Sequence, residues 1–245
     1  MKRAFENAAA FIAYLTLGDG GLKYSIESAL ALVEGGIDVL EIGLPFSDPI
    51  ADGPVIQQAM ERSLQQGTKA EDLILFLKAF RQQSEIPVVL FSYYNPILAA
   101  GKNFLMRAKS AGADGILLVD LPFELMPKSA LDPIFVVSTS TPQQRIRQIA
   151  ERAKGFIYYA CQKGTTGMRH SLPSHFSYDV ARIKQESSLP VVAGFGISNQ
   201  QIAREAIAIA DGFVVGSYFV EAMGRKATPE ELINLAKEID PRRTR

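Results

Sequence analysis

Two carboxylates lie close together in an otherwise apolar part of the sequence. Glu41 stands inside the aliphatic run 37–42 (IDVLEI), and Asp52 follows in the loop after it. A run of this composition predicts a strand buried on both faces, where an ionised side chain costs several kcal/mol unless it is paired. An unpaired glutamate has its pKa raised there, which suits a group that exchanges protons near neutral pH. Glu41 and Asp52 are therefore candidates for general acid–base chemistry, with an ordinary hydrogen-bonded core glutamate as the alternative.

Glycine-rich turns supply a candidate anion site. Residues 194–198 read GFGIS and residues 216–217 read GS, and each segment ends a predicted strand. Backbone N–H groups can approach phosphate oxygens where no side chain intervenes, and a helix that begins there adds partial positive charge. We predict that Gly194, Gly196, Gly216 and Ser217 bind a phosphate group. The alternative is that these glycines only make tight turns.

A third loop, residues 162–169, contains the sequence GTTG and is typical of a lid that excludes water. In that case Gly167 adds a phosphate-facing amide and Thr166 hydrogen-bonds to Asp52. An ordinary flexible surface loop is the alternative. Tyr158 and Phe195 could flank a flat apolar substrate, although aromatic residues in barrel strands are more often core.

Short β-rich runs alternate with helical patterns along the chain and would position these residues. The predicted strands are 9–16, 38–43, 87–93, 115–119, 133–137, 156–160, 190–195 and 212–216. This alternation predicts an α/β fold, a single (β/α)8 TIM barrel over residues 1–245, with a short extra helix at 218–223 after the eighth strand. A doubly wound sheet would alternate in the same way, but residues 17–21 (LGDGG) lack its phosphate-binding turn.

Amphipathic periodicity predicts helices between the strands, for example over 70–84 and 143–153. The apolar face of the first should be core, formed by Leu73, Leu75, Phe76, Leu77 and Phe80. Several helix starts place a hydroxyl residue three positions before Gln or Glu, which predicts N-caps at Thr141, Ser198 and Thr228.

Composition excludes several classes of protein. Lys and Arg number 26 and Asp and Glu also number 26, so no net basic field exists to attract nucleic acid or anionic membrane. The apolar runs are shorter than the ~20 residues of a membrane span, and no cleavable signal is recognisable, so we expect a cytoplasmic protein. A single cysteine, Cys161, and two separated histidines predict neither an internal disulfide nor a metal site.

Several motifs, taken together and in order, resemble the tryptophan synthase α-subunit family. They are 41–54 (EIGLPFSDPIADGP), 92–97 (SYYNPI), 120–122 (DLP), 164–167 (GTTG), 194–198 (GFGIS) and 216–217 (GS). The long acid-bearing segment is the specific part, because glycine pairs alone are common. The resemblance implies a lyase of tryptophan biosynthesis that cleaves indole-3-glycerol phosphate to indole and glyceraldehyde 3-phosphate by a retro-aldol reaction. It also implies that this subunit needs no metal or organic cofactor.

The resemblance assigns roles to individual residues. Glu41 matches the general acid/base that protonates the indole carbon and assists removal of the proton from the hydroxyl of the departing chain. Asp52 matches the carboxylate that binds the indole N–H and stabilises its developing positive charge. Thr166 matches the lid threonine that engages Asp52. The phosphate pocket is matched by Gly167, Gly194, Gly196, Gly216 and Ser217, and the indole site by Tyr158 and Phe195.

The resemblance also implies a partner, a pyridoxal-phosphate-bearing β subunit that receives indole through a tunnel in an allosteric α2β2 heterotetramer. The loops that would face it contain Pro45, Asp48, Asn95 and Pro122. Pyridoxal phosphate is expected in that partner only.

Some positions depart from the family pattern. Tyr14 stands where the family has an indole-contacting phenylalanine, and Met168 adds bulk beside a phosphate-binding glycine. The segment before the first strand is short, so the helix that plugs the barrel bottom in the family should be reduced. Two other functions are therefore open: a lyase-impaired subunit that mainly activates the β subunit, and another phosphate-using barrel enzyme of amino-acid biosynthesis.

Overall fold

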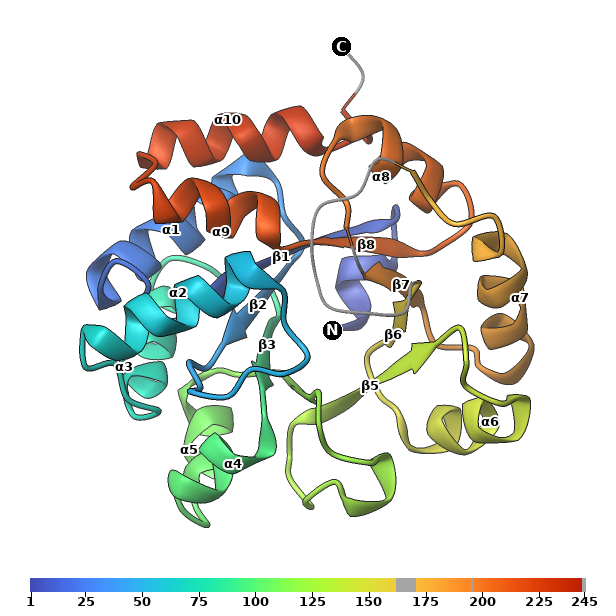
Figure 1. Cartoon of the computed structure of the whole chain (residues 1–245), viewed down its shortest axis with the longest axis horizontal. Helices are drawn as coiled ribbons and strands as arrows, with labels where there is room; N and C mark the ends of the chain where they lie inside the picture. Colours follow the sequence, from blue (N-terminus) through green and yellow to red (C-terminus); the bar gives the residue numbers. More distant parts are fainter. Residues whose placement is uncertain (162–170, 195, 244–245) are drawn as a thin grey trace.

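The computed structural model describes residues 1–161, 171–194 and 196–243, and these form a closed barrel of parallel strands in the order β1 to β8 (Figure 1). The strands are β1 (Ala10–Thr16), β2 (Val39–Gly43), β3 (Val88–Ser92), β4 (Gly115–Leu118), β5 (Asp132–Ser138), β6 (Ile157–Ala160), β7 (Val191–Gly194) and β8 (Gly212–Val215). The predicted TIM barrel is confirmed, and each predicted strand overlaps an observed one.

The strands are aliphatic because both of their faces are covered. In β1 every side chain is buried. Ile12 and Tyr14 belong to the cluster inside the barrel, whereas Phe11, Ala13 and Leu15 belong to the cluster between the strands and the helices. This alternation is the two-residue period of a strand, and it determines which side chains of each strand reach the interior.

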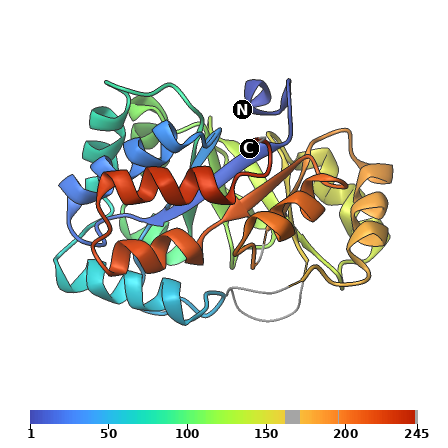
Figure 2. The same ribbon diagram turned by 90° about the horizontal axis from the view of Figure 1, so that it is seen from above.

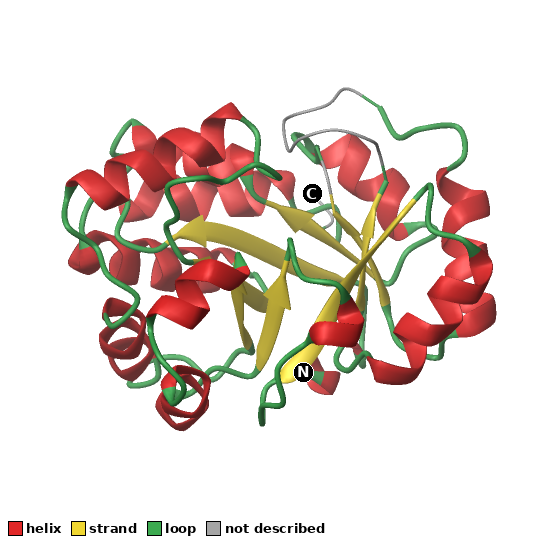
Figure 3. Ribbon diagram, turned by 60° about the horizontal axis from the view of Figure 1, so that its bottom comes forward, coloured by secondary structure: helices red, strands yellow, loops and turns green. Residues whose placement is uncertain are grey.

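Helices surround the barrel, as Figures 2 and 3 show. They are α1 (Leu22–Gly35), α2 (Pro54–Gln65), α3 (Asp72–Phe80), α4 (Tyr94–Ala99), α5 (Phe104–Ala111), α6 (Gln143–Arg152), α7 (Phe176–Glu186), α8 (Gln200–Ile207), α9 (Ser217–Gly224) and α10 (Pro229–Ile239). The extra helix after the eighth strand is α9. Within the described part of the chain, none of the helices has the length and apolarity to cross a membrane.

Details of the helix predictions need correction. Thr228 forms a full capping box at the start of α10, as predicted. At α8, however, Asn199 rather than Ser198 is the N-cap, and its side chain accepts the N–H of Ile202 at 3.0 Å. Thr141 does not cap α6, because its Oγ1 accepts the N–H of Ser138 instead. The predicted core face of α3 is buried except for Leu75, which is 55% exposed on the solvent side.

The connection from β4 to β5 breaks the regular alternation. Residues 119–131, all of them described, contain only the 3-10 helix η2 (Phe123–Leu125) and no α-helix. Phe123 covers the barrel wall in place of that helix: its ring meets Phe135 with centroids 6.1 Å apart, and the Arg145 guanidinium lies over it. The alternation of strands and helices is therefore interrupted here, and Figure 1 shows a loop that leads into β5.

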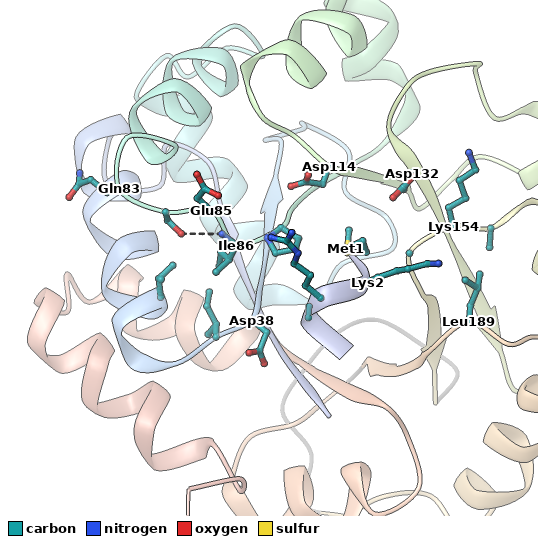
Figure 4. Close-up of a pocket in the computed structure, with 18 residues that line it drawn as sticks. Met1, Lys2, Asp38, Gln83, Glu85, Ile86, Asp114, Asp132, Lys154 and Leu189 are labelled. Atoms are coloured by element: carbon teal, nitrogen blue, oxygen red, sulfur yellow. Dashed lines mark hydrogen bonds between the residues drawn. The ribbon is translucent and has the colours of Figure 1, made fainter. Parts of the chain in front are cut away.

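The N-terminal segment closes the bottom of the barrel only partly. It forms the 3-10 helix η1 (Lys2–Phe5), and Phe5 meets Phe156 inside the barrel. A cavity of about 1050 Å³ lies beside it at the N-terminal ends of the strands. Figure 4 shows charged side chains around this cavity, among them Lys2, Asp38 and Asp114.

Candidate active site

Glu41 lies inside the barrel, on β2. Its neighbours Leu40 and Ile42 face the outer cluster and Val39 faces the inner one, so the two-residue period turns Glu41 inward. In the pairing of β1 with β2 it lies opposite Tyr14. The residue is 1% exposed, and neither carboxyl oxygen has a hydrogen-bond partner among the described residues. Burial raises the pKa of Glu41 to about 8, which makes it a proton donor near neutral pH.

Asp52 lies in the loop between β2 and α2 and is also buried, at 3% exposure. The Tyr93 hydroxyl donates a hydrogen bond of 2.6 Å to its Oδ2. Burial raises the pKa of Asp52 to about 6, and the hydrogen bond from Tyr93 opposes that rise. The loop backbone is held from α2, because Gln57 Nε2 donates to the Asp52 carbonyl at 2.7 Å. Asp52 is thus a largely ionised carboxylate at neutral pH.

Aromatic and aliphatic side chains surround the two acids. Tyr14 on β1 and Tyr158 on β6 are buried, and burial together with the charges of Glu41 and Asp52 raises the pKa of both phenols. Val136 on β5 pairs with Tyr158 and is 36% exposed, although Ile134 two residues earlier is fully buried inside the barrel. Of these two inward-facing residues of β5, only the one nearer the C-terminal ends of the strands is accessible, and ligands of TIM barrels bind at that end.

Two glycines make room for the tyrosine rings. A Cβ atom at Gly194 would lie 1.9 Å from Cε1 of Tyr158, and one at Gly43 would lie 2.1 Å from the hydroxyl of Tyr14. Neither position can hold a larger residue unless the ring moves. Gly194 is predicted to bind phosphate, and the packing of Tyr158 gives it a second reason to be glycine.

The remaining predicted phosphate residues lie at the same end of the barrel. Gly216 is the N-cap of α9, and Ser217 is the first residue of that helix, directly after β8. Gly216 lies beside Tyr14: a Cβ atom added at Gly216 would lie 3.6 Å from the Cβ of Tyr14. Gly196 has φ +77°, a conformation that favours glycine. Thr166, Gly167 and Phe195 lie outside the described residues.

Sequence reasoning missed two residues of the site. Tyr93 contacts Asp52 although 41 positions separate them, and Val136 is an accessible, inward-facing residue of β5. The pattern around Tyr93 reads as the end of a buried strand, so only the fold reveals its contact. Val136 could have been found from its strand, since its parity places it inward like Ile134.

The residues predicted to face a partner differ in accessibility. Asp48, Asn95 and Pro122 are exposed, whereas Pro45 is buried within the chain. Ile50, in the same loop as Asp48, is 79% exposed. The interface therefore stays a prediction, with Pro45 contributing at most through the shape of its loop.

The described residues contain no group of three or more His, Cys, Asp or Glu side chains that could hold a metal ion. Cys161 is a buried cysteine whose Sγ donates to the Gly194 carbonyl at 3.2 Å. The candidate chemistry of the site therefore rests on the two carboxyl groups.

Comparison with known proteins identifies the family. A family model described as tryptophan synthase alpha chain matches residues 1–242. A tryptophan synthase alpha chain from Coxiella burnetii is 47% identical, covering 98% of this chain and 97% of the relative, and one from Chlamydia felis is 49% identical, covering 99% and 98%. A mutant tryptophan synthase alpha-subunit from the hyperthermophile Pyrococcus furiosus superposes with a TM-score of 0.85 at 35% identity, covering 95% of this chain and 98% of that one. Nothing in these comparisons favours a non-catalytic role. The chain belongs to the tryptophan synthase alpha chain family.

Proposed function

We propose that Glu41 and Asp52 carry out the lyase reaction of this family, the cleavage of indole-3-glycerol phosphate to indole and glyceraldehyde 3-phosphate. The observation that carries the proposal is the Glu41 carboxyl group, buried inside the open end of the barrel with no described hydrogen-bond partner. Such a group costs stability unless a ligand completes it. The substrate has one carbon that must be protonated and one hydroxyl that must be deprotonated. The unpartnered carboxyl group of Glu41 can do both.

The proton balance closes on Glu41 alone. The protonated carboxyl group gives its proton to the indole carbon that bears the glycerol chain, and positive charge develops on the ring nitrogen. The resulting carboxylate accepts the proton of the hydroxyl on the adjacent chain carbon. The carbon–carbon bond then breaks, its electrons restore the indole, and the chain leaves as the aldehyde. Glu41 ends protonated, ready for another turnover.

Asp52 suits the complementary task because its charge differs from that of Glu41. With a pKa of about 8 Glu41 is mostly protonated at neutral pH, and with a pKa of about 6 Asp52 is mostly ionised. A fixed carboxylate in a buried site stabilises positive charge that develops on the ring nitrogen more strongly than water would. Two carboxyl groups whose pKa values are pushed apart are a recognised arrangement for acid–base catalysis.

The residues that line the site are suited to an aromatic ring on one side and to an anion on the other. Tyr158 and Val136 lie opposite each other on adjacent strands and offer apolar surface to an indole. The N-terminus of α9, with Gly216 and Ser217, supplies backbone N–H groups and a hydroxyl for the phosphate. The chemistry needs neither a metal nor an organic cofactor in this chain.

The assembly proposed with this function is an α2β2 complex in which a β subunit carries pyridoxal phosphate and consumes the indole. Asp48 and Pro122 are exposed in loops and Asn95 is exposed in α4, and Ile50 exposes a large apolar side chain in the same loop as Asp48. These exposed residues are available to contact another chain, which is what the proposed assembly requires.

The test is a direct assay of cleavage. The purified chain is incubated with indole-3-glycerol phosphate, with and without a β subunit, and indole and glyceraldehyde 3-phosphate are quantified. We expect equal amounts of both products, formed faster when β is present. Absence of both products in both mixtures would overturn the proposal. If the chain nevertheless accelerated the conversion of indole and serine by β, the activating role would replace it.

A further inference from the structure

Tyr93 directly follows β3 and places its hydroxyl between two groups of the loop that carries Asp52. The hydroxyl donates to Asp52 Oδ2 at 2.6 Å and accepts the backbone N–H of Ala51 at 2.9 Å. The residue is 1% exposed. One buried phenol therefore holds both the side chain of the carboxylate and the backbone immediately before it.

The phenol itself is firmly placed. Its ring belongs to the inner cluster and packs against Phe46, with the ring centroids 5.1 Å apart. Its carbonyl accepts a hydrogen bond from the Ser92 hydroxyl at 2.8 Å. Phe46 lies near the start of the loop between β2 and α2, and Ala51 and Asp52 lie near its end. Tyr93 thus ties both parts of that loop to the strand end.

This arrangement solves a problem that burial creates for Asp52. A carboxylate at 3% exposure would otherwise lose its charge and could rotate toward solvent. Tyr93 donates to Oδ2, and none of the described residues donates to Oδ1, the oxygen that we assign to a ligand N–H. A hydrogen bond to the ionised form of an acid stabilises that form.

We propose that Tyr93 is a positioning residue, which fixes the Asp52 carboxylate and its loop in the geometry that receives the ring N–H of the substrate. The proposal rests on the proposed function of Asp52. In this role Tyr93 acts through Asp52.

The chain contains a matched control. Tyr159 on β6 also is fully buried and also donates from its hydroxyl to a carboxylate, Asp179 Oδ2, at 2.7 Å. That pair belongs to the outer side of the barrel, where Tyr159 packs against Phe176 of α7. Tyr93→Phe and Tyr159→Phe each remove one hydroxyl from a buried tyrosine–aspartate pair, and only the first pair lies at the site.

Two measurements separate positioning from structural support. Carbon NMR of the carboxyl groups in the ligand-free protein follows the titration of Asp52, whose pKa should rise above its value of about 6 in Tyr93→Phe and stay unchanged in Tyr159→Phe. In the cleavage assay Tyr93→Phe should lower kcat about tenfold and move the acid limb of kcat/KM to higher pH. Tyr159→Phe should leave both unchanged.

The proposal is overturned if Tyr93→Phe leaves the titration of Asp52 and the acid limb where they are. The NMR titration needs no turnover, so it decides the role of Tyr93 even if the wild-type chain fails to cleave the substrate. Should Tyr93→Phe not fold, hydrogen exchange of the wild-type chain provides the test. The Ala51 amide should exchange slowly although Ala51 is exposed, and fast exchange would contradict the hydrogen bond to Tyr93.

Discussion

Carboxylates at the two ends of the barrel differ in whether they have charged partners. At the N-terminal end, three aspartates each lie directly before a strand and accept a backbone N–H from the preceding strand, at 2.7 to 2.9 Å. Each also pairs with a cation: Asp38 with Arg242, Asp114 with Arg81, and Asp211 with Lys184. These carboxylates join neighbouring strands and helices, and all of their contacts lie within the chain.

At the C-terminal end neither Glu41 nor Asp52 pairs with a cation among the described residues. Both are more deeply buried than the paired aspartates, so the cost of their charge is higher. Buried charges are normally paired, and natural proteins break this rule mainly at functional sites. The comparison teaches that the presence of an acid does not mark the site; an acid with missing partners does.

Replacing the orphaned acid should have the largest effect. Glu41→Gln keeps the shape of the side chain but cannot transfer protons, so we expect cleavage to fall by about 10²- to 10⁴-fold. Initial rates of indole release measure this. A loss smaller than tenfold would remove Glu41 from its proposed role.

The same variant should become more stable than the wild type as pH rises. Folding raises the pKa of Glu41 from 4.5 to about 8, so the folded state holds a proton that the unfolded state releases between these values. The free energy of unfolding of the wild type therefore falls across that window, by about 1.4 kcal/mol for each pH unit. Urea unfolding of both proteins at pH 5 and pH 8 would show the gap widening in favour of Glu41→Gln.

The pH dependence of cleavage should report both acids. Activity requires Glu41 protonated and Asp52 ionised, so kcat/KM should decline below about pH 6 and above about pH 8. Each limb should approach a slope of about tenfold per pH unit. A profile that stays flat from pH 5 to pH 9 would contradict the assignment of unpaired acids to this end of the barrel.

Sequence alone could predict the barrel and the two acids because their signals are local. Aliphatic runs mark the strands wherever both faces are buried, and a glutamate within such a run is conspicuous. The general alternation of strands and helices does not hold between β4 and β5, where Pro122 and Pro127 disfavour a continuous helix in residues 119–131. Periodicity likewise assigns Leu75 to the core, although the helix turns it to solvent.

Contacts between segments that are distant in the chain could not be predicted from the sequence. Nothing in the sequence near Tyr93 indicates that its hydroxyl meets Asp52, because the contact depends on how the β2 loop folds back over the end of β3. The steric need for Gly194 likewise arises from Tyr158 on a neighbouring strand. A sequence pattern reports the environment of a residue along its own element and carries little information on side chains that other elements bring to it.

Removing a carboxylate from the N-terminal end should affect stability and leave catalysis intact. Asp114→Asn keeps an acceptor for the Val88 N–H but weakens the contact with Arg81, which also bonds the carbonyls of Gly112 and Ile86. We expect the free energy of unfolding to fall by about 1–2 kcal/mol, while kcat/KM at neutral pH stays within twofold. Denaturant titration and the cleavage assay measure the two quantities. A large loss of activity in a folded variant would erase the distinction between the two ends.

The smallest effect should come from the most exposed of the three pairs. The side chains of Lys184 and Asp211 are 38% and 39% exposed, so water and salt screen their attraction. In Lys184→Ala, Asp211 keeps the N–H of Val191 through its Oδ2. The free energy of unfolding should therefore fall by about 0.2–1 kcal/mol, less than in Asp114→Asn, and the difference should shrink further in 1 M salt. If Lys184→Ala lost as much stability as Asp114→Asn at every salt concentration, solvent exposure would not set the strength of these ion pairs, and the order of effects expected here would be wrong.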